Sequence, residues 1–304
     1  MDKWIEYYLQ YLLNLKQYSK DTIISYRHVL KGFSLFYRES GLESIDEIRY
    51  PLIRGYIVTL HDQKLNHNSI RHHISVLRSF FNYLMDNDVA KQNPFALVNQ
   101  PKTQKRMPEF LYLDEFEMLV DSIDTSDLLG QRNRMLLELL YATGIRVGEA
   151  IKIKLVDIDY YQDLIRVTGK GNKMREVPFN PICEEYMKAY QEEVRPELLA
   201  KSKESHPYFL VNQYGRPMTE RGVYDIIKRV GQKSGLNKKI HPHMFRHTFA
   251  THLLDQGADL RIVQEMMGHV DIASTQIYTH VTMDQLKKSY VNAHPMAKNK
   301  NKKI

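Results

Sequence analysis

The chain has 304 residues, a length that suggests two domains. Hydrophobic residues make up 43% and charged residues 26%, which excludes a fibrous repeat and a wholly disordered chain. The 43 basic side chains outnumber the 36 acidic ones, and the net charge of +7 is compatible with a polyanionic partner such as nucleic acid.

The location expected from the sequence is the cytoplasm. Cys183 is the only cysteine, which excludes a disulfide framework and a cysteine-rich metal site. The first ten residues carry Asp2, Lys3 and Glu6, which are atypical of a signal peptide. No segment is apolar for long enough to span a bilayer, so we expect no membrane insertion.

Residues 1–100 are predicted to form a bundle of four helices. Apolar side chains recur at helical spacing in four runs, which start at Trp4, Ile23, Leu52 and Ile70. Ser19 precedes the second run, and Asn66 or Asn68 precedes the fourth, as N-capping residues do. Short connections between amphipathic helices are typical of a small bundle, and no strand pattern is present.

The next segment, 101–108, is predicted to be a linker. It is polar and basic and lies between Pro101 and Pro108, which disfavour a continuous helix. Residues 1–108 hold 15 basic and 10 acidic side chains, whereas residues 109–304 hold 28 and 26. The basic excess therefore belongs mainly to the helical domain, the linker and the lysines of the C-terminal tail.

A second domain is expected over residues 109–291, mostly helical with a small antiparallel sheet. Helices are predicted at 113–123 and 132–141, and strands at 164–168 and 175–179. The strands flank the glycine-rich turn 169–173, which indicates a hairpin. Helices follow, among them Met283 to Tyr290, and the Lys/Asn-rich residues 292–304 are predicted to be a disordered tail.

Two cations in this domain are candidates for contact with an anion. Gly144 can end a helix, which places Arg146 at the start of the next helix with its guanidinium free to bind an anion. Lys170 lies at the hairpin tip, where it could donate a proton or contact a phosphate. Each has a simpler interpretation, a solvated surface charge for Arg146 and an ordinary exposed turn for Lys170.

Histidines and one arginine form a denser group further along. His243 and Arg246 are three residues apart, so a helix presents them side by side toward an anionic oxygen pair. His243 and His247 also have the spacing of zinc ligands, but no third ligand and no general-base glutamate accompany them. His247 could equally be a polar cap on a core helix.

Two further positions complete the candidates. Gly268 is a helix stop with His269 directly after it, and lone histidines are more often structural than chemical. Tyr278 follows, and since the chain has 20 tyrosines, composition alone cannot select it.

The order of these residues resembles the signature of the tyrosine site-specific recombinases, the integrase family. The resemblance covers the chain apart from its tail, and the motifs are most similar to those of the bacterial Xer subgroup, which resolves chromosome dimers. The segments that carry it are 142–149, 168–173, 241–254, 256–261 and 275–282.

The resemblance implies a fold, a reaction and roles for residues. The fold is a helical core-binding domain followed by a mostly helical catalytic domain. Tyr278 would attack a DNA phosphodiester to form a 3′-phosphotyrosine, without metal or cofactor. Arg146 and Arg246 would clamp the phosphate, and Lys170 would protonate the leaving oxygen. His243 would assist proton transfer, and His269 would donate to a phosphate oxygen.

Partners follow from the same resemblance: a double-stranded recombination site, a tetramer of identical or paralogous subunits, and a cell-division DNA translocase as regulator. The helix 283–290 would dock on a neighbouring subunit, or else fold back on its own domain. Glu149 could support the site through Arg146 or His243. Candidate phosphate contacts are Lys102, Lys105, Arg106, Lys173, Arg175 and Arg221.

Four other functions remain in competition with this interpretation. A mobile-element or phage integrase shares the whole signature. A type IB topoisomerase uses the same chemistry for relaxation, although the small helical domain argues against it. A DNA-binding module without catalysis would be expected to have lost some of the set. A zinc hydrolase would have to rest on the histidine group alone.

Overall fold

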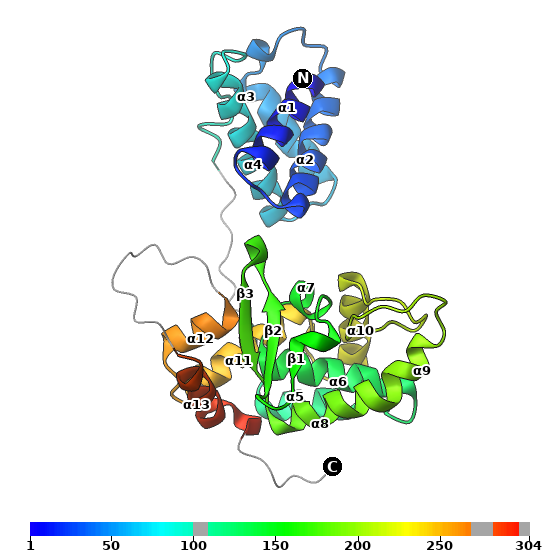
Figure 1. Ribbon diagram of the computed structural model, residues 1–304. Coiled ribbons are helices and arrows are strands. Elements are labelled where there is room, and N and C mark those ends of the chain that lie inside the picture. The colour runs from blue at the N-terminus through cyan, green and yellow to red at the C-terminus, as the bar shows by residue number, and fades with distance from the viewer. Residues whose placement is uncertain (100–108, 269–281, 298–304) are drawn as a thin grey trace. The chain divides into compact units, whose positions relative to one another are not determined.

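The computed structural model describes residues 1–99, 109–268 and 282–297. The chain divides into two compact units, Met1–Arg106 and Met107–Ile304 (Figure 1). The linker expected at 101–108 lies outside the described residues. None of the helices in the described ranges combines the length and the apolar character that a membrane crossing requires.

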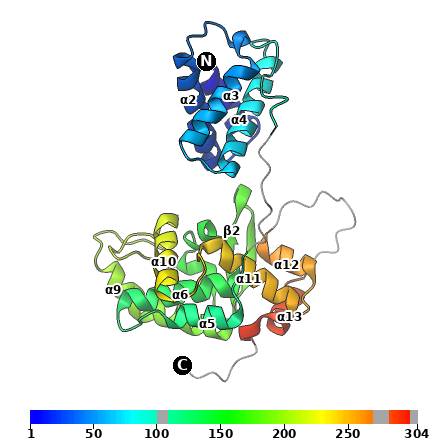
Figure 2. The same ribbon diagram turned by 180° about the vertical axis from the view of Figure 1, so that it is seen from behind.

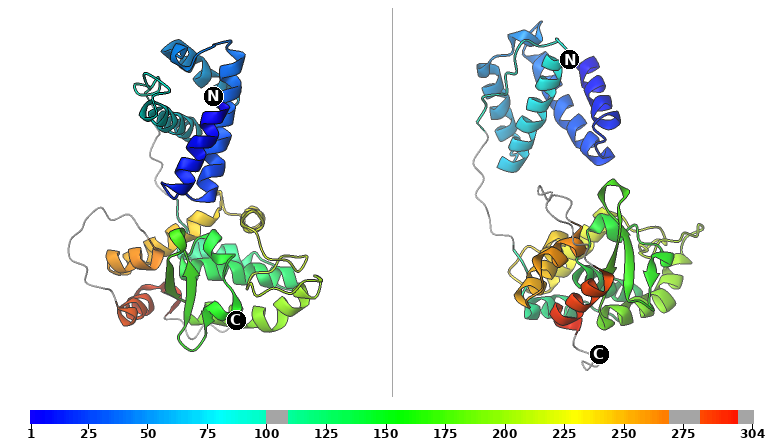
Figure 3. Two further views of the ribbon diagram at one scale, coloured as in Figure 1. Left: turned by 45° about the horizontal axis from the view of Figure 1, so that its top comes forward. Right: turned by 60° about the vertical axis from the view of Figure 1, so that its left-hand side comes forward.

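The first unit is a bundle of four α-helices, as predicted (Figure 3). The hydroxyl of Ser19 accepts a hydrogen bond from the Thr22 N–H, so this predicted N-cap is confirmed. Of the two candidates for the fourth helix, the N-cap is Asn66, whose side chain accepts from the Ser69 N–H. No strand occurs within residues 1–99. The elements are α1 (Asp2–Asn14), α2 (Lys20–Glu39), a 3₁₀ turn (Ile45–Glu47), α3 (Tyr50–Asp62) and α4 (His67–Asp86).

Aromatic rings fill the core of this bundle. The Phe33 ring of α2 lies edge-on to Tyr56 of α3, with 5.0 Å between centroids, and 5.5 Å from Phe95. Phe81 of α4 packs on Phe95 as well, also at 5.5 Å. Each such pair stabilises a core by about 0.5–1.5 kcal/mol in addition to the contribution of the apolar area that it buries.

The second unit is built around the buried helix α6 (Leu128–Thr143), which packs against α11 (Pro242–Asp255; Figure 2) and α8 (Pro181–Ala189). The mostly helical prediction is confirmed. The other helices that precede residue 269 are α5 (Leu113–Asp121), α7 (Val147–Ala150), α8 (Pro181–Ala189), α9 (Arg195–Leu199), α10 (Glu220–Lys233), α11 (Pro242–Asp255) and α12 (Leu260–Met267), with 3₁₀ turns at Leu155–Asp157 and Lys170–Asn172 and a π-helical turn at Tyr190–Val194.

The sheet has three antiparallel strands in the order β1–β2–β3. Strand β2 (Leu164–Thr168) pairs with β3 (Met174–Pro178) in a register that places Thr168 opposite Met174, so the predicted hairpin is confirmed. The first strand, β1 (Ile158–Asp159), escaped sequence analysis because two residues are too short to show a period.

The C-terminal helix α13 (Met283–Ala293) folds on its own unit. Its Leu286 and Tyr290 pack with Phe249 of α11 and Val263 of α12, and the Tyr290 hydroxyl donates to the Ala142 carbonyl at 2.9 Å. In this single chain, helix α13 therefore packs on its own unit, and docking on a neighbouring subunit stays a prediction.

The boundary of the tail expected at residue 292 is wrong. Helix α13 continues to Ala293, and a 3₁₀ turn at Pro295–Ala297 follows it with Met296 and Ala297 buried. His294 is fully buried between aromatic rings, 5.0 Å from both Tyr141 and Tyr290. Burial of these side chains orders the backbone through residue 297, and residues 298–304 lie outside the described part.

Candidate active site

The first site residue is placed by a helix end. Helix α6 stops at Gly144, whose φ of +59° is the left-handed conformation that glycine adopts most readily. A Cβ at this position would lie 2.3 Å from the Phe249 ring of α11, so the turn also needs a residue without a side chain. Arg146 follows as the N-cap of α7, as predicted from the sequence.

A buried carboxylate lies beneath Arg146. Glu149 is 4% exposed, and its oxygens accept from the Arg146 backbone N–H at 2.9 Å and the Arg146 guanidinium at 3.1 Å. Arg175 of β3 donates to both oxygens, at 3.0 and 2.9 Å. Burial alone would raise the pKa of Glu149, but the hydrogen bonds and charges of Arg175 and Arg146 outweigh it and lower that pKa.

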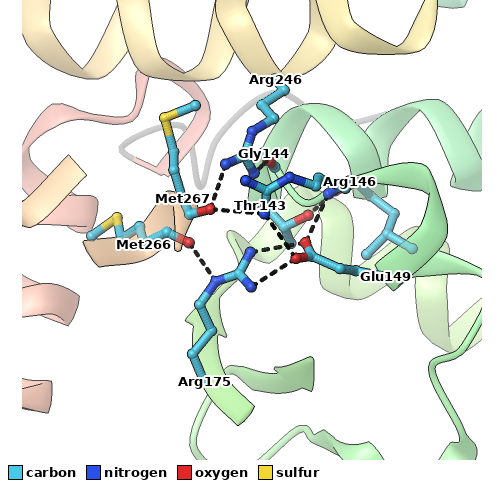
Figure 4. A network of polar contacts seen from close by, with 9 residues as sticks. Thr143, Gly144, Arg146, Glu149, Arg175, Arg246, Met266 and Met267 are labelled. Atoms are coloured by element: carbon cyan, nitrogen blue, oxygen red, sulfur yellow. Dashed lines mark hydrogen bonds and ion pairs between the residues drawn. The ribbon is translucent and has the colours of Figure 1, made fainter. Parts of the chain in front are cut away.

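Arg246 reaches the same place from α11. It is buried, and its guanidinium donates to the Gly144 carbonyl at 2.8 Å and to the Met267 carbonyl (Figure 4). Arg146 approaches that same Met267 carbonyl at 3.5 Å. Burial, and then the positive charge of Arg146, lower the pKa of Arg246 to about 10, so it stays protonated at neutral pH. Two guanidiniums thus converge on one acceptor.

His243 lies one helical turn before Arg246 on α11 and is exposed. The predicted helix that carries both residues is therefore confirmed. His247 is on the same helix, but no group of three or more potential metal ligands exists among the described histidine, cysteine and carboxylate side chains. The described residues therefore offer nothing for the zinc interpretation.

The hairpin brings a third element to the site. Lys170 opens the turn between β2 and β3, and the Gly169 N–H closes that turn on the Lys173 carbonyl at 2.8 Å. A Cβ at Gly169 would lie 3.3 Å from Glu149 Oε1 and 3.5 Å from Arg175 Nη1. The residue before Lys170 therefore packs directly on the Glu149–Arg175 pair.

Two predicted catalytic residues, His269 and Tyr278, lie outside the described residues. Gly268, directly before His269, ends α12 with a φ of +62°, so the predicted helix stop is confirmed. A Cβ at Gly268 would lie 3.0 Å from Arg175 Cζ. Gly268, the last described residue before His269, therefore packs against Arg175.

The predicted phosphate contacts have different surroundings. Lys173 is exposed at the hairpin, and Arg221 is 86% exposed at the start of α10 with an ion pair to Asp225 at 3.2 Å. Arg175, which is also a predicted phosphate contact, has a side chain that is 14% exposed and that donates to Glu149 and to the Met266 carbonyl. Lys102, Lys105 and Arg106 lie outside the described residues.

Sequence reasoning missed two parts of this network. Arg175 and Glu149 are 26 residues apart, so no local pattern links them. The carbonyls of Met266 and Met267 are backbone groups, so a search for charged or catalytic side chains does not find them. The bidentate geometry between Arg175 and Glu149 is the feature that identifies the pair, and it exists only in three dimensions.

Comparisons with known proteins place the chain in a family. Residues 109–285 match the Phage integrase family, and residues 5–88 match the Phage integrase N-terminal SAM-like domain. The tyrosine recombinase XerC of Bacillus licheniformis is 44% identical over 290 residues, 95% of each chain. That of Bacillus subtilis is 43% identical over 298 residues, 98% of each chain.

Solved structures agree with this fold. The structure of a lambda integrase dimer (75–356) bound to a COC′ core site has a TM-score of 0.70 at 18% identity, and it covers 93% of this chain and 99% of that one. The XerH site-specific recombinase bound to difH substrate has a TM-score of 0.65 at 25% identity, and it covers 89% and 78%. Because the family model covers more than half of the chain and the XerC relatives nearly all of it, the chain belongs to the phage integrase family, as a tyrosine recombinase that cuts and rejoins DNA.

Proposed function

We propose that this chain recombines double-stranded DNA through a 3′-phosphotyrosine at Tyr278 and resolves chromosome dimers at cell division. The observation that carries the proposal is the convergence of Arg146 and Arg246, from two distant helices, on the Met267 carbonyl. Phosphoryl transfer accumulates negative charge on non-bridging oxygens, and preorganised guanidiniums stabilise that charge.

The electrostatics of the described site favour an anionic ligand. Arg246 is buried beside Arg146, and their mutual repulsion contributes to the lowered pKa of Arg246. A phosphate between the two guanidiniums would replace that repulsion with two attractive contacts. Glu149 pairs with both Arg175 and Arg146, so this one carboxylate balances only part of the positive charge, and the rest remains for a ligand.

The reaction follows from the roles of the set. The Tyr278 hydroxyl oxygen attacks phosphorus, the bond to the 5′-oxygen breaks, and Lys170 gives that oxygen a proton. His243 assists removal of the tyrosine proton, and His269 donates to a non-bridging oxygen. In the second step a 5′-hydroxyl of the partner strand attacks the phosphotyrosine, so the bond energy is retained. No metal takes part, and we expect chelators to leave cleavage unchanged.

The test uses a nicked duplex that traps the covalent adduct. Tyr278→Phe is expected to bind this duplex with wild-type affinity and form no adduct, because phenylalanine lacks the attacking oxygen. The matched control is Tyr161→Phe, since Tyr161 is 92% exposed, and it should form adduct normally. Formation of the adduct by Tyr278→Phe would overturn the assignment. A wild-type adduct that no longer forms once a chelator removes metal ions would overturn it as well.

The cellular role is supported by the similarity to XerC proteins over almost the whole chain. We propose a cytoplasmic enzyme that acts in a tetramer of identical or paralogous subunits, with a cell-division DNA translocase as regulator. Deletion of the gene should cause a partition defect that disappears when homologous recombination is also removed, because only homologous exchange forms dimers. A defect that persists would favour another role, such as integration of a mobile element.

A relaxation assay separates recombination from topoisomerase activity. A recombinase should convert a plasmid with two copies of its site into two circles, whereas a type IB topoisomerase relaxes a supercoiled plasmid that lacks any site. Efficient relaxation without a site would contradict the proposal. A module without catalysis would give neither product nor a covalent adduct.

A further inference from the structure

Arg175 holds a central place among elements that bear the predicted catalytic residues. Its guanidinium pairs with Glu149 through two parallel hydrogen bonds, and its Nε–H donates to the Met266 carbonyl at 2.9 Å (Figure 4). The side chain is 14% exposed, so it has little surface left for a ligand. Strand β3, helix α7 and the end of helix α12 therefore meet at one side chain.

Two glycines pack against this ion pair. Gly169 precedes Lys170, and a Cβ there would lie 3.3 Å from Glu149 Oε1 and 3.5 Å from Arg175 Nη1. Gly268 precedes His269, and a Cβ there would lie within 3.1 Å of three guanidinium atoms of Arg175. The Glu149–Arg175 ion pair therefore packs against Gly169 and Gly268, which directly precede the predicted catalytic residues Lys170 and His269.

The last turn of α12 is held by arginines from other elements. Helix C-termini leave their final carbonyls without partners inside the helix, and cations near them are stabilising. Arg175 takes the Met266 carbonyl, while Arg246 and Arg146 approach the Met267 carbonyl. Loss of Arg175 would remove the contact with the Met266 carbonyl at this helix end and the packing against the hairpin turn together.

We infer that Arg175 is a positioning residue, which sets where Lys170 begins by fixing Gly169, and where helix α12 ends by fixing Gly268, against its pair with Glu149. This inference rests on the proposed function, because it concerns the positions of residues assigned there. The contacts of Arg175 in the structure are with Glu149 and the Met266 carbonyl. It acts on cleavage through the geometry of its neighbours, and displacement by about 1 Å can lower a rate by about 10²-fold.

A lysine at this position cannot replace the arginine. The guanidinium presents its donors in a planar fork, so it can satisfy both Glu149 oxygens and the Met266 carbonyl at once. An ammonium is a point charge on a flexible stem. Arg175→Lys keeps the charge next to Glu149 but loses the fixed contact with the two glycines, so it distinguishes positioning from charge alone.

The experiment measures single-turnover cleavage of a nicked duplex by the full chain at saturating protein. Arg175→Lys and Arg175→Gln should cleave about 10²-fold more slowly, with an unchanged Kd for the duplex. The matched control is Arg166→Gln on β2, whose ion pair with Glu176 at 3.6 Å is exposed, and it should cleave at the wild-type rate. A wild-type rate in Arg175→Gln would overturn the inference.

A second substrate reports on Lys170 specifically. When sulfur replaces the 5′-bridging oxygen, the leaving group needs no proton, because thiols have a pKa of about 8.5. This substrate should restore most of the rate of Lys170→Ala and a large part of the rate of Arg175→Gln. Recovery in Lys170→Ala without any recovery in Arg175→Gln would show that Arg175 does not position Lys170, and would overturn that part of the inference.

Failure of the proposed function gives a different pattern. If sulfur does not rescue Lys170→Ala, the role of Lys170 as acid is wrong. The Arg175 inference is then tested by the single-turnover cleavage rate and the Kd for the duplex. A slower rate at unchanged Kd supports positioning, whereas a loss of affinity that matches the loss of rate overturns it.

A double variant separates folding from positioning. Arg175→Gln leaves the buried Glu149 carboxylate with Arg146 alone, which lowers stability. Glu149→Gln combined with Arg175→Gln removes both charges, so its Tm should return toward the wild-type value while cleavage stays slow. Recovery of the cleavage rate together with Tm would show a purely structural role and would contradict the inference.

Discussion

The two units of this chain bury very different side chains. In the described part of the first unit, Ser34 is the one polar residue that is buried, and aromatic and aliphatic groups fill the rest of the core. Among the described residues of the second unit, five charged groups are buried: Arg132, Glu138, Glu149, Arg195 and Arg246. By sequence, however, the first 108 residues carry the larger basic excess.

This difference shows where each unit keeps its charges. A buried charge lowers stability unless it is paired and hydrogen-bonded, so a protein that buries several must surround them with partners. Within residues 1–99 no lysine or arginine is buried, so these cations can attract a polyanion at long range. The second unit fixes a few guanidiniums inside, which suits chemistry at one phosphate.

The largest expected effect tests the apolar core of the first unit. Phe33→Ala should lower the free energy of unfolding of that unit by about 3–5 kcal/mol, because the ring contacts Tyr56 and Phe95 and leaves a cavity. Hydrogen exchange of the full chain should show lost protection in α2 and α4 but not in α6. Leu35→Ala, at a position 59% exposed on α2, is the control. Equal loss in α6 would contradict separate cores.

The next prediction tests the fixed cations of the second unit. Arg146→Lys and Arg246→Lys should each slow formation of the covalent adduct by about 10²–10³-fold, because an ammonium cannot reproduce the guanidinium fork. The Kd for DNA should change little. Arg229→Lys, on the exposed side of α10, is the matched control. A loss of affinity that equals the loss of rate would show that these arginines hold DNA rather than the transition state.

We expect the stability of the folded chain to depend on pH because of His294. Burial lowers its pKa to about 3, so the folded chain keeps it neutral, while the unfolded chain binds a proton below about pH 6.5. Its contribution to stability is therefore present at neutral pH and decreases on acidification, by up to about 3 kcal/mol at pH 4.

The corresponding variant is His294→Asn, whose amide oxygen can accept from the Met296 N–H as the histidine Nδ1 does. The asparagine does not titrate, so its Tm should fall less than that of the wild type between pH 7 and pH 4. Glu138, whose pKa burial raises to about 7, has the opposite trend and is common to both proteins. Parallel Tm curves for the two proteins would refute the role of His294.

The smallest expected effect concerns surface charge on the second unit. Lys173→Ala should weaken DNA binding uniformly across sequences and reduce the slope of log Kd against log salt by about 1, as the loss of one phosphate contact does. Lys188→Ala is the control, because Lys188 is already paired with Glu184 at 2.6 Å. An unchanged slope for Lys173→Ala would show that Lys173 makes no phosphate contact.

Local chemistry was sufficient for much of the fold and of the candidate site. Apolar periodicity and capping residues predicted the four helices of the first unit, and the glycine-rich turn predicted the hairpin at β2 and β3. Gly144 and Gly268 were predicted to end helices, and both adopt positive φ. These signals operate within a few residues, so the amino-acid sequence alone was enough to show them.

Tertiary structure decided which charges meet. The pairing of Arg175 with Glu149 joins residues 26 apart, and the convergence on Met267 joins helices α7, α11 and α12. It also ordered residues 292–297, whose buried side chains pack on α6 and α11. Such contacts depend on how distant segments are brought together in three dimensions, and no local pattern of side chains encodes that arrangement.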